Sequence, residues 1–305
     1  MLRTLQLVTT RRSFFDTQVE SLERKGVDCT VVEVPQPAPD EVDGRSAADY
    51  MRFYADTVGE ALQGDYDLVH ANYGLVAPAA LAQPTRPVVL SLWGSDIMGP
   101  AWLTRLSRTA ARASSAVVVP SMAAGAALDR PHHRIPFGVD TDQFRPVPKA
   151  EARAEVGWDT DKPIVLFPYD TDREVKNYPL AERVVEQTPV DAELRTISDV
   201  PYERVPLYMN ASDAVLVTSK RESGPMVVKE AAACNVPVVS ATVGFAPEVL
   251  SNAARSHCCR TETEFVEALT AVLSARERSD GRGRVAQLDV DTGERLLELY
   301  RSLLD

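Results

Sequence analysis

Two glutamates eight positions apart, Glu222 and Glu230, are the residues whose types and spacing most strongly suggest a functional site in this sequence. Residues 223–225 (Ser-Gly-Pro) predict a turn, and residues 225–234 predict a helix that begins at the proline and is capped by the serine or glycine before it. The unpaired N–H groups of such a helix start form an anion site. Carboxylates on both sides of it could accept hydrogen bonds from a sugar and a ribose that flank a bound phosphate. By spacing alone, a capped helix with two ordinary surface glutamates is an equal alternative.

The stretch from Glu222 to Ser240 resembles the signature of the retaining glycosyltransferases of family 4, which have the GT-B fold. The family has a glutamate, a Gly/Ser/Pro turn, a second glutamate eight positions on, an Ala-rich helix and a Pro-Val-Val strand. The segment 135–146, with its Gly-Val-Asp, and the later Val243-Gly244 turn are also similar to the family. The resemblance implies that Glu222 contacts the donor sugar and Glu230 the nucleotide ribose. It implies further donor-binding roles for Ser223, Gly224, Pro225 and Met226.

A second site element, residues 167–177, follows the first strand of the second half of the chain. The family holds the donor diphosphate with an arginine and a lysine in this loop, and Arg173 and Lys176 match them. Two cations and a helix start would stabilise the charge on a departing diphosphate by about several kcal/mol. Taken alone, an Arg-x-x-Lys pair is more often a solvated surface pair, and this loop lacks the family's usual glycine. Base readout is expected at Ser198 and Asp199.

The first half of the chain is expected to bind the acceptor. Trp93 and Gly94 end a strand, and the tryptophan could stack on a sugar face or serve as a core aromatic residue. Asp96 matches a family aspartate, although capping of the next helix is the favoured interpretation. His70 and Asn72 end another strand and are expected to line the cleft.

The first loop, residues 9–15, lacks the family's common glycine pair. Arg11 and Arg12 could meet an anionic acceptor or a membrane surface, with Phe14 as an anchor. A solvated loop followed by a helix start is the favoured alternative.

The elements that must position these residues alternate between apolar strands and helices. Buried parallel strands are expected at residues 5–9, 29–34, 67–71, 87–92 and 116–119, then at 163–167, 194–197, 214–218 and 236–240. Helices are expected at residues 14–25, 50–62, 179–187, 225–234, 262–276 and 292–304, and a loop at Gly281–Arg284.

A proline-rich linker at residues 144–148 separates two similar α/β halves. We therefore predict an α/β fold of the GT-B type, with two Rossmann-like, doubly wound parallel-sheet domains facing across a cleft. The expected domains are residues 1–146 for the acceptor, residues 147–290 for the nucleotide sugar, and a C-terminal helix at residues 291–305 that packs back on the first domain.

Composition excludes several classes of protein. The 305 residues are 45% hydrophobic and 25% charged, as in folded globular proteins. A net charge of −11 without long Lys/Arg runs argues against a nucleic-acid partner. No apolar run spans a membrane, no signal peptide is evident, and four cysteines do not form a disulfide framework. A cytoplasmic protein is expected, with peripheral membrane contact as an alternative.

No metal and no cofactor beyond the nucleotide sugar as co-substrate are expected. Asp-x-Asp occurs five times in this acidic chain and is uninformative, and the four histidines lack metal-ligand spacing. The Asp-x-Asp pairs begin at Asp65, Asp140, Asp159, Asp170 and Asp289. Lys229, in the middle of a predicted helix, is expected to face solvent.

The sequence thus predicts a retaining, metal-independent glycosyltransferase that moves a sugar from a UDP- or GDP-sugar to a hydroxyl of a glycan, a lipid or a small molecule. By resemblance, the leaving phosphate acts as the base for the incoming hydroxyl. Two alternatives remain open: a nucleotide-sugar epimerase, disfavoured by the few histidines, and a non-catalytic partner subunit of the same fold, disfavoured by the donor motifs. The sequence leaves the oligomeric state open.

Overall fold

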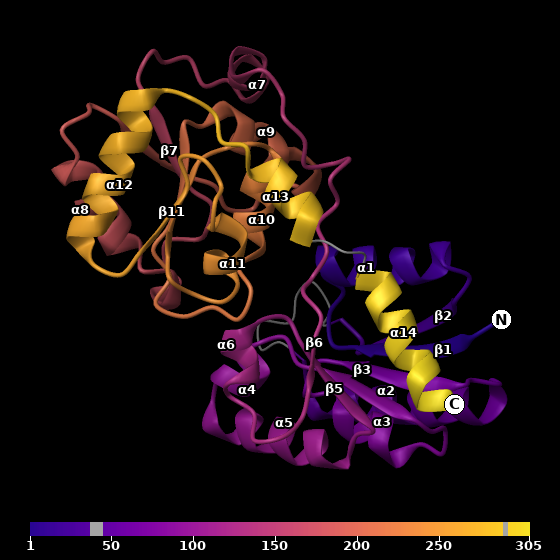
Figure 1. Ribbon diagram of the computed structural model, residues 1–305. Coiled ribbons are helices and arrows are strands. Elements are labelled where there is room, and N and C mark those ends of the chain that lie inside the picture. Colours follow the sequence, from indigo (N-terminus) through magenta and orange to yellow (C-terminus); the bar gives the residue numbers. More distant parts are fainter. Residues whose placement is uncertain (37–44, 289–291) are drawn as a thin grey trace. The chain divides into compact units, whose positions relative to one another are not determined.

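The computed structural model describes residues 1–36, 45–288 and 292–305, and the chain divides into two compact units (Figure 1). Unit 1 comprises residues 1–138 and 290–305, and unit 2 comprises residues 139–289. The linker expected at residues 144–148 lies within unit 2, because Phe144 is fully buried and the Arg282 guanidinium donates to the Phe144 carbonyl oxygen at 2.8 Å. The boundary expected after residue 290 lies outside the described residues. An acceptor domain and a donor domain remain predictions.

Unit 1 contains a six-stranded parallel sheet with the order β2-β1-β3-β4-β5-β6. Its elements are β1 (Arg3–Val8), α1 (Ser13–Arg24), β2 (Asp28–Glu33), α2 (Ala47–Gln63), β3 (Leu68–Asn72), α3 (Ala77–Ala82), β4 (Val88–Ser91), α4 (Ser95–Met98), α5 (Ala101–Ala113), β5 (Ala116–Val119), α6 (Met122–Gly125), β6 (His133–Arg134) and α14 (Thr292–Leu304).

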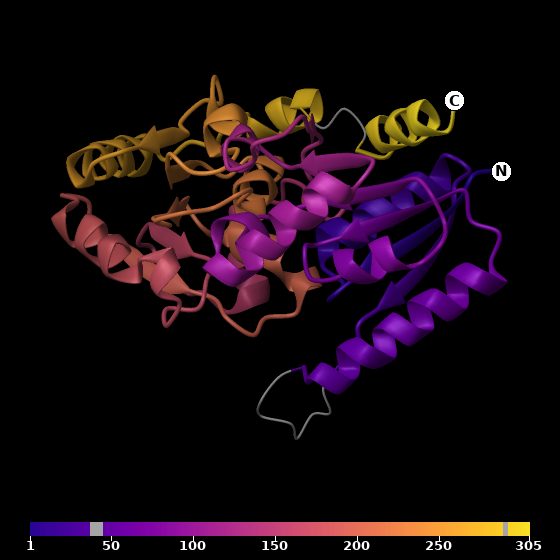
Figure 2. The same ribbon diagram turned by 90° about the horizontal axis from the view of Figure 1, so that it is seen from below.

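Helices cover both faces of this sheet, because successive strand residues point to opposite sides. Leu5 and Leu7 pack with α2, α3 and α5, whereas Leu68 and Val89 pack on the other face with α1 and α14. Figure 2 shows the sheet between α14 in yellow and the long α2 in violet. The last helix fills this second core with Leu296 and other apolar residues, so unit 1 is built from both ends of the chain.

Unit 2 contains a five-stranded parallel sheet with the order β11-β10-β9-β7-β8. Its elements are α7 (Lys149–Val156), β7 (Ile164–Phe167), the 3-10 turn η1 (Glu174–Lys176), α8 (Tyr178–Gln187), β8 (Glu193–Thr196), the 3-10 turn η2 (Tyr202–Arg204), α9 (Val205–Ala211), β9 (Ala214–Val217), α10 (Met226–Ala233), β10 (Val238–Ala241), α11 (Ala246–Leu250), β11 (His257–Cys259), α12 (Glu262–Ala275) and α13 (Gly281–Leu288).

The loop predicted at Gly281–Arg284 is wrong, since these residues begin α13. Packing overrides the low helix propensity of two glycines here. Gly281 lies so close to α10 that a Cβ atom on it would be 2.9 Å from the Ala232 Cβ. The Arg282 N–H donates to Asn235 Oδ1 at 2.9 Å. Close packing and this bond hold the glycine-rich segment as a helix.

The two sheets share one topology, and this fixes where ligands are expected. In each unit the first strand lies between the second and the third strand of that unit, namely β1 between β2 and β3, and β7 between β8 and β9. The predicted pair of doubly wound parallel sheets is therefore confirmed. In such sheets, ligands bind beyond the carboxyl ends of the strands where the strand order reverses. The loops after β1 and β3 and those after β7 and β9 are thus the candidate sites.

Candidate functional site

Lys176 and Glu222 meet at the reversal point of unit 2. Lys176 lies in the loop after β7 and Glu222 in the loop after β9, and the lysine ammonium donates to Glu222 Oε1 in an ion pair. The side chains are only 7% and 17% exposed. Thr218 joins the two loops, because its Oγ1 lies 3.0 Å from the carbonyl oxygens of both Lys176 and Asn177. The fold thus brings together the residues predicted to hold diphosphate and sugar.

Two residues that the sequence did not single out, Tyr169 and Ser219, also contact this ion pair. The Lys176 ammonium lies 3.8 Å from the centre of the Tyr169 ring, a cation–π contact. Ser219 donates its hydroxyl to Glu222 Oε1 at 2.9 Å. Burial lowers the pKa of Lys176, an effect that the Glu222 charge opposes. Burial also raises the pKa of Tyr169 well above its ordinary value, with the charges of Glu222 and Glu230 adding to it.

Glu230, on α10, is only 3% exposed. Its Oε1 accepts a hydrogen bond from the Tyr202 hydroxyl at 2.7 Å. Burial raises the pKa of Glu230 to about 7, while the bond from Tyr202 acts in the opposite direction. The alternative of an ordinary surface glutamate is therefore wrong for this residue. Tyr202 carries no motif, and only its place in the fold reveals its role.

The helix start at the turn differs in detail from the expectation. α10 begins at Met226, and Pro225 is the cap residue rather than the first helical residue. Among the residues that the structure describes, none caps this helix through its side chain. The glycine of the turn is needed for space, because a Cβ atom on Gly224 would lie 2.5 Å from the Phe245 ring. Ser223 is half-buried in the same turn.

Lys229 is buried, not solvent-facing as expected. It is 1% exposed, and its ammonium lies 5.3 Å from the centre of the Phe245 ring. α10 is buried over most of its length, from Val228 to Ala233, so the helix offers its middle residues no solvent face.

The remaining residues predicted for the donor are exposed. Arg173 precedes η1, and its carbonyl oxygen accepts the Lys176 N–H at 2.8 Å. Ser198 and Asp199 follow β8, the neighbour of β7 in the sheet, and are exposed. Because parallel strands end at one edge of a sheet, both loops lie at the edge that carries Lys176. Their roles remain predictions.

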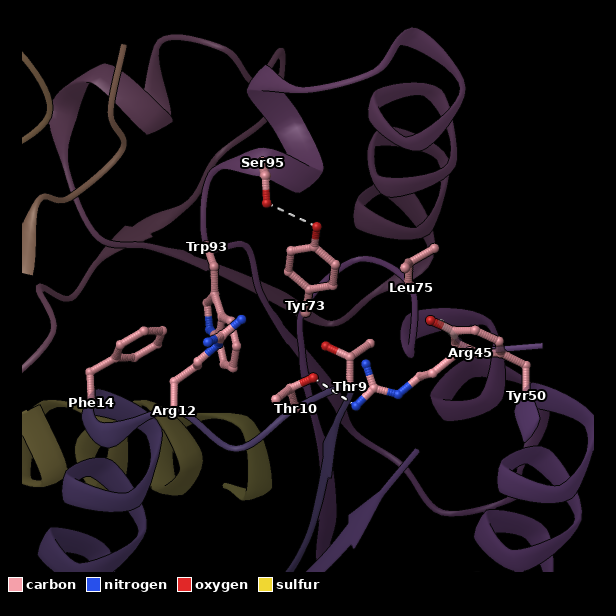
Figure 3. Close-up of a pocket in the computed structure, with 10 residues that line it drawn as sticks. All are labelled: Thr9, Thr10, Arg12, Phe14, Arg45, Tyr50, Tyr73, Leu75, Trp93 and Ser95. Atoms are coloured by element: carbon pink, nitrogen blue, oxygen red, sulfur yellow. Dashed lines mark hydrogen bonds between the residues drawn. The ribbon is translucent and has the colours of Figure 1, made fainter. Parts of the chain in front are cut away.

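A pocket of about 400 Å³ lies at the reversal point of unit 1 (Figure 3). The loops after β1, β3 and β4 supply most of its wall. It is lined by Thr9, Thr10, Arg12, Phe14, Arg45, Tyr50, Tyr73, Leu75, Trp93 and Ser95. Arg45, Tyr50 and Tyr73 were not predicted, because only the fold brings them to the first loop.

Asp96 is fully buried and organises the pocket wall from behind. Its carboxylate accepts the N–H groups of Trp93 at 3.0 Å, Gly94 at 2.6 Å and Gly74 at 3.0 Å. Burial raises the pKa of Asp96, and these backbone bonds oppose the shift. The expectation that Asp96 caps the next helix is wrong, because Asp96 lies inside α4 and its carboxylate accepts backbone N–H groups that precede this helix. Its role in the fold is nevertheless structural. Trp93 lines the pocket and also packs against the buried Val8, Phe15 and Val19, so the structure agrees with both interpretations of this residue.

His70 and Asn72 are fully buried, and not exposed at a cleft as expected. His70 lies between the Tyr300 hydroxyl, 2.6 Å from Nδ1, and the Ser91 hydroxyl, 2.7 Å from Nε2. Burial lowers the pKa of His70 to about 3. Asn72 donates to Gln6 Oε1 at 3.0 Å. Both side chains point from β3 to the face that α1 and α14 cover, so they form a polar core.

In the first loop, Arg12 lines the pocket and Arg11 does not. The Arg11 guanidinium pairs with Asp16 at 2.7 Å on the surface. Phe14 packs against two rings, with its centroid 4.8 Å from that of Trp93 and 4.3 Å from that of Phe137. A side chain packed in this way is not exposed as a membrane anchor would be.

Among residues 1–36, 45–288 and 292–305, no three His, Cys, Asp or Glu side chains are grouped so that they could hold a metal ion. The Asp-x-Asp at Asp289 lies outside the described residues. In the same part of the chain, none of the helices has the length and apolar character needed to span a bilayer. The absence of a metal remains a prediction.

Sequence comparison covers both units. The model of Glycosyltransferase Family 4 matches residues 14–143, and that of Glycosyl transferases group 1 matches residues 174–287. D-inositol 3-phosphate glycosyltransferase of Xylanimonas cellulosilytica is 27% identical over 239 residues, which are 60% of this chain and 57% of that protein. The match thus spans little more than half the length of this curated relative.

Comparison with solved structures supports the fold. Sucrose-phosphate synthase from Thermosynechococcus elongatus is similar over 99% of both chains, with a TM-score of 0.83 and 16% identity. HepE from Anabaena, in complex with UDP and glucose, is similar over 99% of this chain and 100% of its own, with a TM-score of 0.76 and 18% identity.

Two doubly wound parallel sheets, together with the similarity to solved glycosyltransferases over nearly the whole chain, identify the GT-B fold. The chain belongs to the family 4 type of GT-B glycosyltransferases, as its motifs predicted.

Proposed function

We propose that this chain is a retaining, metal-independent glycosyltransferase that uses a nucleoside diphosphate sugar. The observation that carries the proposal is the buried Lys176–Glu222 ion pair at the reversal point of unit 2, with the Lys176 ammonium also in contact with the Tyr169 ring. UDP-sugars are favoured over GDP-sugars, because HepE was solved with UDP-glucose. The acceptor is a hydroxyl of a glycan, a lipid or a small molecule.

In the proposed reaction, Arg173 and Lys176 hold the diphosphate, Glu230 accepts hydrogen bonds from the ribose, and Glu222 positions the sugar. The bond between the anomeric carbon and the phosphate oxygen breaks, and its electron pair remains on the phosphate. The acceptor oxygen bonds to the same face of the anomeric carbon and gives its proton to the departing phosphate. The products are a glycoside of unchanged anomeric configuration and a nucleoside diphosphate, and no protein nucleophile or cofactor takes part.

The side chains of this site suit such a donor. An ammonium group has three N–H donors, so Lys176 is able to keep Glu222 while it binds a phosphate oxygen. In a buried, largely water-free setting, the positive charge stabilises the developing phosphate charge more strongly than it would in water. Arg173, which is exposed, adds a second cation from the same loop.

The test is transfer from a panel of UDP- and GDP-sugars to mixed hydroxyl acceptors, measured as nucleoside diphosphate released and, by NMR, as the anomeric configuration of the product. We expect Lys176→Ala and Arg173→Ala each to lower the rate by about 10²- to 10³-fold, the loss typical of a group that stabilises transition-state charge. Lys162→Ala is the matched control, because Lys162 pairs with Asp191 on the surface of the same unit at 2.7 Å. EDTA should leave the rate unchanged.

Other outcomes identify the alternatives. Wild-type rates in both variants would contradict the roles of Arg173 and Lys176. Conversion of the nucleotide sugar without any acceptor would indicate an epimerase. Absence of nucleotide-sugar binding in calorimetry would indicate a non-catalytic subunit.

A further inference from the structure

The described residues that line the pocket of unit 1 carry positive charge, although the chain as a whole is acidic. The chain has a net charge of −11, yet the described residues that line this pocket include two arginines and no carboxylate. A local excess of positive charge against the overall field favours an anionic ligand.

Within the described part of the chain, neither of the two guanidinium groups is paired with a carboxylate. Arg45 donates through Nη2 to Thr10 Oγ1 at 2.7 Å and through Nε to the Pro35 carbonyl oxygen at 3.2 Å, so neutral oxygens fix its position. The Arg12 side chain forms no ion pair or hydrogen bond within the described part of the chain. Its neighbour Arg11, in contrast, is paired with Asp16.

The start of α1 adds to this charge. Arg12 is the residue that precedes the helix, and the twelve-residue helix begins at Ser13. The first N–H groups of a helix carry partial positive charge and bind anions. Two guanidinium groups and a helix start together match a dianion with several oxygens, and phosphate fits this description better than a carboxylate does.

The pocket also has aromatic lining residues, and one of them, Tyr73, is held in a strained backbone conformation. Tyr73 has a φ of +103°, which side chains other than glycine rarely adopt. Its N–H donates to the Ser91 carbonyl oxygen at 2.9 Å, and its hydroxyl lies 2.9 Å from Ser95 Oγ. The centre of its ring lies 5.9 Å from that of Trp93. Strain that the surroundings enforce is found at binding sites, and tyrosine and tryptophan faces pack against apolar ring surfaces.

We propose that this pocket binds an acceptor that is a small hydroxylated ring compound bearing a phosphoryl group. Arg12 and Arg45 hold the phosphoryl group, and the ring lies against Tyr73 and Trp93. A volume of about 400 Å³ suits a ligand of monosaccharide size. The acceptor role rests on the function proposed above, whereas the phosphate site rests on the pocket alone.

Binding is tested by titration calorimetry on the full chain without donor. The probes are aldose, ketose and cyclitol monophosphates, each beside its unphosphorylated parent, with glucuronate as the carboxylate probe and inorganic phosphate alone. At least one monophosphate should bind about tenfold or more tightly than its parent, and added salt should reduce the difference. Arg12→Gln and Arg45→Gln should each weaken the binding of that monophosphate by about tenfold to a hundredfold.

Arg105→Gln is the matched control, because Arg105 is an exposed arginine on α5 of the same unit and does not line the pocket. Thermal melting shows whether each variant is folded, and Arg12→Gln is the safer of the two, since its side chain holds no loop. Equal binding of monophosphates and parents, or unchanged discrimination in both variants, would overturn the proposal. Glucuronate binding as tightly as the best monophosphate would overturn the phosphoryl assignment.

A parallel assay separates this inference from the proposed function. Transfer from a UDP-sugar to a monophosphate acceptor, at equal rates in the wild type and in Arg12→Gln and no faster than transfer to the unphosphorylated parent, would keep the function and reject the phosphorylated acceptor. Failure to bind any nucleotide sugar would reject the function, while the phosphate titrations would still report on the pocket.

Discussion

The loops at the reversal points of the two sheets occupy the same topological position but treat charge in opposite ways. In unit 2, Lys176 is paired with Glu222, and Glu230 receives the Tyr202 hydroxyl. In unit 1, the pocket has Arg12 and Arg45 with no carboxylate among its described lining residues.

The difference shows two ways to prepare a site on one topology. A buried charge with a partner is fixed before any ligand arrives, because an unpaired charge in that position would be too unfavourable. A charge at an open pocket tolerates the absence of a partner, because water solvates it until a ligand takes the place of water. A variant that removes one member of the buried pair in unit 2 should therefore lower the stability of the fold. A variant that removes an arginine of the pocket in unit 1 should instead weaken ligand binding.

The largest effect is expected from breaking the buried pair. Glu222→Leu leaves the Lys176 ammonium buried without its partner, so the free energy of unfolding should fall by about 3–5 kcal/mol. Lys176→Met combined with Glu222→Leu should restore part of this loss, because no isolated charge then remains. Urea unfolding measures all of these, with Asp191→Ala as the exposed-pair control, for which no measurable change is expected. If the double variant were less stable than Glu222→Leu, internal pairing would not be the source of stability.

Buried titratable groups should give the two units opposite pH responses. Burial raises the pKa of Glu230 from 4.5 to about 7, so the folded state favours its neutral form. Its stabilising contribution is complete below pH 4.5 and is lost as the pH rises to about 7, in total by about 3 kcal/mol. Burial lowers the pKa of His70 from 6.5 to about 3, so its contribution is complete above pH 6.5 and is lost as the pH falls.

Urea unfolding between pH 5 and pH 8 checks both signs. Relative to the wild type, Glu230→Gln should gain stability as the pH rises from 5 to 7, and His70→Gln should gain stability as the pH falls from 6.5 to 5. Parallel pH curves for the wild type and both variants would show that neither group titrates in this way.

An intermediate effect is expected from Asp96→Asn. The amide keeps the shape of the carboxylate but cannot accept hydrogen bonds from three backbone N–H groups equally well. The free energy of unfolding should therefore fall by about 2 kcal/mol. The Trp93–Gly94 turn should loosen, and sugar phosphates should bind more weakly to the pocket. Intrinsic tryptophan fluorescence and calorimetry follow the two effects. Retained stability together with unchanged binding would show that the carboxylate does not organise this wall.

The smallest effect is expected from Tyr300→Phe, which removes the hydroxyl beside His70 Nδ1. Loss of this buried hydrogen bond should cost about 1–2 kcal/mol of stability. Tyr54→Phe on α2, where the side chain is 41% exposed, is the control. Donor binding should be unaffected, since unit 2 holds the donor in the proposed function. Equal stability of the wild type and Tyr300→Phe would show that the hydroxyl contributes little.

The sequence was sufficient for the features that depend on local pattern. Apolar runs such as residues 116–119 and 214–218 predicted strands of both sheets, because strands covered on both faces need continuous apolar residues. The Glu222–Glu230 spacing and Lys176 identified side chains that the fold places at one reversal point.

The rest depends on which loops meet and which face a side chain takes. Arg45 and Tyr73 reach the pocket from segments far from Arg12, and neither belongs to a motif. His70 was expected at the end of a strand, but it is the middle residue of β3, and the alternation of that strand directs its side chain into the core beside Tyr300. Lys229 is buried because α10 is enclosed over most of its length, which helix periodicity alone does not reveal.

The return of the last helix to unit 1 sets an order of events during translation. All of unit 2 emerges from the ribosome before α14 does, so unit 2 is able to fold while unit 1 is still incomplete. Until Leu296 and Tyr300 emerge, the apolar surface that they cover on α1 and the sheet is open to water. Unit 1, although its synthesis begins first, is thus the unit that finishes last and that has most need of protection from aggregation on the ribosome.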